Sequence, residues 1–210
     1  MPNLDHTHCT AFEGSRCVAA GELAQVVQKV KKILDRGECT PILIFDNSTS
    51  EPIEVDFRGT VKDVLARLPS RASAHETSTD PIEAAATDPT AASPRGPGRP
   101  KLGVVAREVT LLPRHWEWLN RQPGGASVAL RKLVEDARRT NAGKDRVRQS
   151  QDATYRFMSA MAGNNPGFEE AARALFAMDA KRFGQHMASW PADIRDHAKK
   201  LAADALGNAS

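Results

Sequence analysis

Residues 70–97 cannot contribute to a folded core, and they divide the chain. The stretch is rich in Ala, Ser, Thr, Pro and Asp, and Ile82 is its only large aliphatic residue. Such a composition buries too little apolar surface to offset the entropy of ordering the backbone. We therefore predict a disordered linker at 70–97, with folded segments on either side of it.

Residues 1–69 have the pattern of a small α+β domain, which begins with a hairpin and a helix. Gly14 lies in a turn between two β-prone runs and predicts the hairpin. Apolar residues recur at helical spacing from Glu22 to Leu34, so we expect a helix there that stops near Gly37.

A second hairpin and a short helix complete the predicted N-terminal domain. The apolar run 41–45 and the alternating residues 53–57 predict two more strands. Thr60 is placed to cap a helix that continues to Leu68. The expected order of elements is ββαββα.

Residues 149–210 predict a helical C-terminal domain made of several short helices. Residues 168–176 carry an apolar stripe at helical spacing, and Trp190-Pro191 is typical of the start of a final helix. We interpret the large apolar side chains of this region as core residues, because helical stripes usually bury themselves. They are Phe176, Phe183, Met187 and Trp190.

The middle of the chain is strongly basic. Residues 95–148 contain thirteen Lys or Arg against five Asp or Glu, a net charge of about +8. Residues 1–94 carry about −5 and residues 149–210 are neutral, so the formal net charge of +3 hides this concentration. A basic segment of this kind indicates a polyanionic partner, most often nucleic acid.

The segment that opens the basic region resembles the AT-hook. Gly98-Arg99-Pro100 is the core of the motif, and Arg95 and Lys101 flank it. Proline holds the chain extended, glycine allows close approach to the groove floor, and arginine sits in the negative potential of a narrow minor groove. Pro97 stands where the family usually has a second arginine, so a basic hinge that only contacts phosphates remains an alternative.

Residues 98–148 as a whole predict a DNA-binding segment, because 104–139 resembles the ribbon-helix-helix fold. A β-prone run at 104–112 precedes a short helix at 113–121, a Gly124-Gly125 turn and a second helix capped by Ser127. The resemblance implies a homodimer in which two chains pair their strands into a ribbon that enters the major groove of double-stranded DNA.

The resemblance also indicates which residues would contact DNA. Strand side chains would face the groove, and the first backbone N–H groups of the second helix would grip phosphate. The candidate DNA-binding residues are Arg95, Gly98, Arg99, Pro100, Lys101, Arg107, Thr110, Arg114, Gly125, Ser127, Arg131 and Lys132.

Glu108 departs from this pattern, because an acidic side chain in the strand would repel phosphate. A ribbon that only dimerises is therefore an open alternative, in which the basic segment docks a protein partner or RNA. An antitoxin-like module, which combines DNA binding with capture of a protein, lies between these two hypotheses.

Nearly the full length of the chain also resembles a bacterial family known only as a domain of unknown function. The clearest stretches are 98–116, 124–130 and 155–163. This resemblance implies no activity, so the functional hypothesis rests on the basic segment: a transcription regulator or a nucleoid-associated protein.

The remaining chemistry-bearing residues do not predict an enzyme, a metal site or a cofactor. His6, His8 and Cys9 lack further ligands nearby, and Cys17 and Cys39 lack an obvious histidine base. No glycine loop of the phosphate- or dinucleotide-binding type is present. The histidines of the helical regions, His115, His186 and His197, are predicted to be surface or boundary residues.

The expected location is the cytoplasm. The three cysteines are an odd number without CxxC spacing, which favours reduced thiols. No apolar stretch approaches the roughly 20 residues needed to span a bilayer. The first residues lack the apolar segment of a secretory signal, so no membrane partner is expected.

Overall fold

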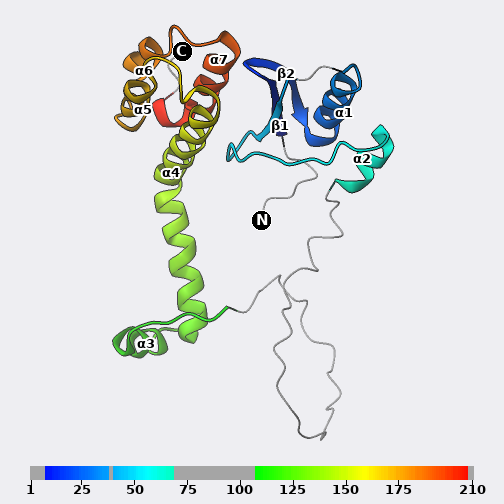
Figure 1. Cartoon of the computed structure of the whole chain (residues 1–210). Coiled ribbons are helices and arrows are strands. Elements are labelled where there is room, and N and C mark those ends of the chain that lie inside the picture. Colours follow the sequence, from blue (N-terminus) through cyan, green and yellow to red (C-terminus); the bar gives the residue numbers. More distant parts are fainter. Residues whose placement is uncertain (1–7, 38–39, 69–106, 208–210) are drawn as a thin grey trace, which may run out of the picture. The chain divides into compact units, whose positions relative to one another are not determined.

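The computed structural model describes residues 8–37, 40–68 and 107–207 (Figure 1). They belong to two compact units: one combines the described residues of 1–76 and 141–210, and the other consists of 107–140. The α+β class expected from the sequence is confirmed. The stretch 70–97, expected to be a linker, lies outside the described residues.

A three-stranded antiparallel sheet in the order β2-β1-β3 forms the N-terminal part of the first unit. β1 (His8–Glu13) and β2 (Arg16–Glu22) make the expected hairpin. Gly14 has a φ of +55° in its turn, a conformation that glycine adopts without a steric penalty. β3 (Ile42–Asp46) pairs with the other side of β1.

Two helices follow in this part of the unit, and both were expected: α1 packs against the sheet and α2 packs against α1. α1 (Leu23–Leu34) buries Val26, Val27 and Val30 completely, in a cluster that also contains Ala11 and Ile44 of the sheet. α2 (Val61–Arg67) begins with a capping box. The Thr60 hydroxyl accepts from the backbone N–H of Asp63, and the Asp63 carboxylate accepts from that of Thr60.

The expected second hairpin is formed only in part, because its pairing ends at the Ile53 N–H, which donates to the Ile44 carbonyl at 2.7 Å. Phe45 and Pro52 form an isolated bridge, and residues 53–57 are not a strand. Proline has no N–H with which to extend a ladder. The Arg67 guanidinium of α2 donates to the backbone carbonyl of Asp56 at 3.0 Å, which holds the segment beside that helix. The N-terminal order is therefore ββαβα.

The C-terminal residues are helical, as expected, but their first helix is far longer than predicted. α4 (Gly125–Ala162) spans 38 residues without a break (Figure 1). No proline interrupts it, and it passes through the domain boundary that we expected at 148–149. The shorter helices that follow are α5 (Phe168–Phe176), α6 (Ala180–His186), α7 (Ala192–Leu201) and α8 (Ala203–Leu206).

These helices enclose most of the predicted C-terminal core. Phe183, Met187 and Trp190 are buried, and the Trp190 Nε1–H donates to the carbonyl of Pro166 at 2.9 Å. Phe176 was predicted to be buried with them and is half exposed, at 50 %. It is the last residue of α5 and contacts the exposed ring of Tyr155 instead of the core.

The sheet and the C-terminal helices share one core. The rings of Phe12 and Phe45 lie 5.3 and 5.4 Å, centre to centre, from the ring of Phe157 on α4. From the sequence we expected 1–69 and 149–210 to be separate domains. In the structure their described residues pack into one unit. These aromatic side chains lie too far apart in the chain for local patterns to indicate their contact.

Candidate nucleic-acid interface

The second unit, residues 107–140, contains α3, the glycine turn and the first part of α4, in the order that the ribbon-helix-helix resemblance implies. α3 (Pro113–Asn120) begins with proline at its first position and buries Leu119. Gly124 and Gly125 follow with φ values of +85° and +75°. Positive φ values of this kind favour glycine. At Gly124 space is also limited, because a Cβ atom there would lie 3.1 Å from the Val128 side chain.

The expected strand is not formed in the single chain. Residues 107–112 are described and are neither strand nor helix, and residues 104–106 lie outside the described part. In the ribbon-helix-helix arrangement this strand pairs with its counterpart from a second chain, and one chain alone cannot supply that ladder. Arg107, Glu108, Val109 and Thr110 are all exposed.

The candidate DNA-binding residues fall into two groups. Those of the AT-hook-like arm lie outside the described residues: Arg95, Gly98, Arg99, Pro100 and Lys101. The others belong to the second unit, where Gly125 is partly buried at the start of α4 and the remainder are exposed. The exposed ones are Arg107, Thr110, Arg114, Ser127, Arg131 and Lys132.

α4 presents a basic face, of which only Arg131 and Lys132 were among the residues predicted to bind DNA. Arg131 and Arg138, and likewise Lys132 and Arg139, are seven residues apart, so the four side chains share one side of the helix. We call these four residues the basic face. All four are exposed, and Arg138 forms a surface ion pair with Glu135 at 3.2 Å. The heptad spacing was visible in the sequence and would have revealed Arg138 and Arg139.

Exposed apolar side chains accompany the basic face in the second unit. Among residues 107–140, Leu119 and Ala129 are the buried apolar residues. Six large apolar side chains are left exposed, and we call them the apolar surface: Val109, Leu112, Trp118, Val128, Leu133 and Val134. Among its described residues this unit therefore buries little apolar surface of its own.

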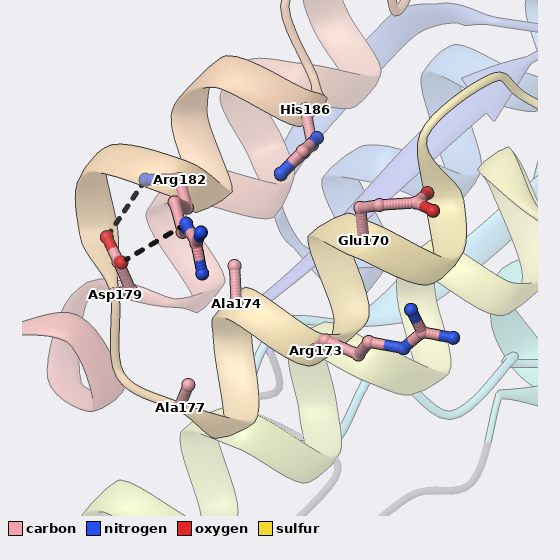
Figure 2. Close-up of a pocket in the computed structure, with 7 residues that line it drawn as sticks. All are labelled: Glu170, Arg173, Ala174, Ala177, Asp179, Arg182 and His186. Atoms are coloured by element: carbon pink, nitrogen blue, oxygen red, sulfur yellow. Dashed lines mark hydrogen bonds and ion pairs between the residues drawn. The ribbon is translucent and has the colours of Figure 1, made fainter.

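A cavity of about 350 Å³ lies between α5 and α6 (Figure 2). Asp179 accepts from the backbone N–H of Arg182 at 2.9 Å and pairs with its guanidinium at 4.0 Å. Figure 2 shows Glu170 and Arg173 pointing to the opposite side, away from Asp179. The acidic and basic groups around this cavity therefore do not converge on one point.

The described residues contain neither a cluster of metal ligands nor a helix able to span a membrane. In 8–37, 40–68 and 107–207, no three His, Cys, Asp or Glu residues gather in a way that could hold a metal ion. None of the helices in these ranges combines the length and the apolar character needed to cross a membrane. Cys9 is buried and Cys17 exposed, both as free thiols, and Cys39 lies outside the described residues.

Comparisons with known proteins agree with the full-length resemblance. Neither the curated proteins nor the solved structures contain a significant match. A family model described as "uncharacterized protein conserved in bacteria (DUF2239)" matches residues 8–202, which is most of the chain. The chain therefore belongs to this bacterial family.

Proposed function

We propose that the protein binds double-stranded DNA as a homodimer, and that it acts as a transcription regulator or a nucleoid-associated protein. The observation that carries the proposal is the basic face of α4. It places four cationic side chains on one side of a helix, within a segment whose net charge is about +8.

The chemistry of these residues suits the phosphate backbone better than the base edges. Phosphate contacts position a protein on a duplex and supply most of its salt-dependent affinity, whereas base contacts specify sequence. Arg131, Lys132 and Arg139 have no ion pair within the described residues, so their charge is available. Sequence preference would come from the arm around Arg99, through the shape of A·T-rich minor grooves.

The apolar surface supports a second copy of the chain as the partner. A homodimer would pair the two 107–112 segments and cover side chains such as Trp118 and Leu133. Residues exposed in one chain would then supply the core that the unit lacks. The first backbone N–H groups of α4, near Ser127, would remain free to bind phosphate.

Glu108 favours a second candidate function, in which the ribbon dimerises and the module captures a protein. Its carboxylate is exposed beside Thr110, where the proposed ribbon would face DNA. An acid at that position would repel phosphate. In this alternative the basic segment binds an acidic protein, as an antitoxin-like module would.

An electrophoretic mobility shift with A·T-rich, G·C-rich and RNA probes tests the proposal and separates the two candidates. The informative variant replaces all four residues of the basic face with Gln. A matched variant carries the same substitution at Lys29, Lys32, Arg173 and Lys181, which are exposed cations outside the basic segment. DNA binding predicts loss of the shift in the first variant alone, and equal shifts for the two variants would reject it.

A further inference from the structure

A second cavity, of about 270 Å³, lies within the first unit. Its wall is built from the turn after β3, from α4 and from the final helices α7 and α8. The lining includes Asn47 and Ser48 of the turn, together with Arg146, His197, Lys200 and Asp204 of the helices. Segments far apart in the sequence thus line one cavity.

Some of the lining groups are already used to hold the fold together. The Ser150 hydroxyl donates to the carbonyl of Leu201 at 2.6 Å and accepts from the backbone N–H of Ala205 at 3.1 Å. The Asn47 side-chain carbonyl accepts from the Thr10 hydroxyl at 2.7 Å. These bonds join α4 to α7 and α8, and join the turn after β3 to β1.

Four other lining groups, all exposed at the surface, have no protein partner among the described residues. The side chains of Arg146, Gln149, Lys200 and Asp204 form no hydrogen bond or ion pair within 8–37, 40–68 and 107–207, although all four line the same space. Arg146 and Lys200 contribute two positive charges and Asp204 one negative charge. The rim therefore has a net charge of about +1, which attracts an anion.

His197 also lines the cavity and carries a buried polar atom without a protein partner. It is only 9 % exposed, and its Nε2 is buried without a hydrogen-bond partner. Buried polar atoms are nearly always paired, with protein, water or ligand, because an unpaired one costs free energy. Burial, and then the charge of Lys200, lowers the pKa of His197 to about 4, so the imidazole is neutral at physiological pH.

We propose that this cavity binds a small organic anion whose carboxylate or phosphate group is held by Arg146 and Lys200. A guanidinium and an ammonium are the groups that recognise these oxyanions. The Asp204 carboxylate would accept from a hydroxyl or amino group elsewhere on the ligand, and the Gln149 amide would donate to or accept from such a group. The neutral His197 ring would complete the floor of the site. The inference does not depend on DNA binding.

Thermal unfolding of the full chain tests the proposal directly. Inorganic phosphate and succinate serve as probes for the two oxyanions, each compared with sodium chloride at the same ionic strength. The test variant is Arg146→Gln combined with Lys200→Gln. The matched control is Arg173→Gln combined with Arg182→Gln, which removes the same charge from the cavity between α5 and α6.

A binding site predicts that at least one probe raises the unfolding temperature in a saturable manner in the wild type and the control. The affinity should fall at least about tenfold in the Arg146/Lys200 variant. Calorimetry should give one bound anion per chain, and the His197 ring protons should shift in the NMR spectrum. An equal response of both variants, or no effect beyond that of chloride, would overturn the proposal.

Discussion

The ring of Phe12, on the first strand of the sheet, packs 5.3 Å from the ring of Phe157 near the C-terminal end of α4. Both side chains are fully buried or nearly so, and 145 residues of chain separate them in the sequence. This contact joins the N-terminal sheet to the C-terminal helices in one core. The stability of the two segments should therefore be linked.

Phe157→Ala should destabilise the protein by about 3–5 kcal/mol, because it removes a buried ring and leaves a cavity. The amides of β1 and of α7 should both exchange faster with solvent, since both elements contact the same core. Urea unfolding and hydrogen exchange measure these effects. Phe176→Ala is the control, because its half-exposed ring should contribute much less. Faster exchange in α7 alone would contradict the shared core.

Stability should fall as the pH decreases from about 6.5 towards 4. The pKa of His197 is lowered from 6.5 to about 4 by burial, so below pH 6.5 the unfolded chain takes up a proton that the folded chain does not. The difference corresponds to about 3 kcal/mol. His197→Gln should remove this part of the pH dependence, whereas His186→Gln should keep it. Urea unfolding at a series of pH values provides the measurement, and identical profiles for the two variants would reject the explanation.

Leu133→Asn combined with Val134→Asn should weaken self-association at least about tenfold, because it places polar groups in the proposed dimer contact. Sedimentation measures the change. Tyr155→Asn with Phe176→Asn makes a similar change to exposed rings of the first unit and should leave the oligomeric state unaltered. A wild-type protein that is monomeric at all concentrations would exclude the dimer.

Arg99→Ala should reduce the preference for A·T-rich over G·C-rich duplex, because arginine gains most from the negative potential of a narrow minor groove. Fluorescence anisotropy with the two duplexes gives the ratio of affinities. Arg95→Ala is the comparison, since Arg95 lies outside the Gly-Arg-Pro core and should weaken both duplexes alike. If Arg99→Ala leaves the ratio unchanged, the AT-hook resemblance has no functional meaning.

Local elements could be predicted because their signals are local. Gly14 marks the first hairpin, Thr60 caps α2, and Gly124 with Gly125 separates α3 from α4, each through the conformation of a few adjacent residues. The fourth strand was wrong because pairing depends on neighbours in space. Ile53 still donates to Ile44, but Arg67 then holds Asp56 beside α2.

Long-range packing could not be predicted in the same way. We predicted His197 to be a surface or boundary residue of its helix. It is instead buried beside Phe12 and Phe157, whose ring centres lie 5.3 and 4.6 Å from its own. Only the folded chain brings these rings together, so sequence patterns missed the cavity that His197 lines. The basic face was partly accessible to sequence reasoning, because charge and heptad spacing are properties of one helix.

The affinity of the full chain for a 30-base-pair duplex, measured against salt concentration, tests the central claim most directly. If the basic face and the arm neutralise several phosphates, the logarithm of the association constant should fall linearly with the logarithm of salt concentration. Between about 50 and 200 mM salt the affinity should decrease by roughly 10³-fold or more for six or more contacts. A chain that binds no duplex even at the lowest salt concentration would contradict the account.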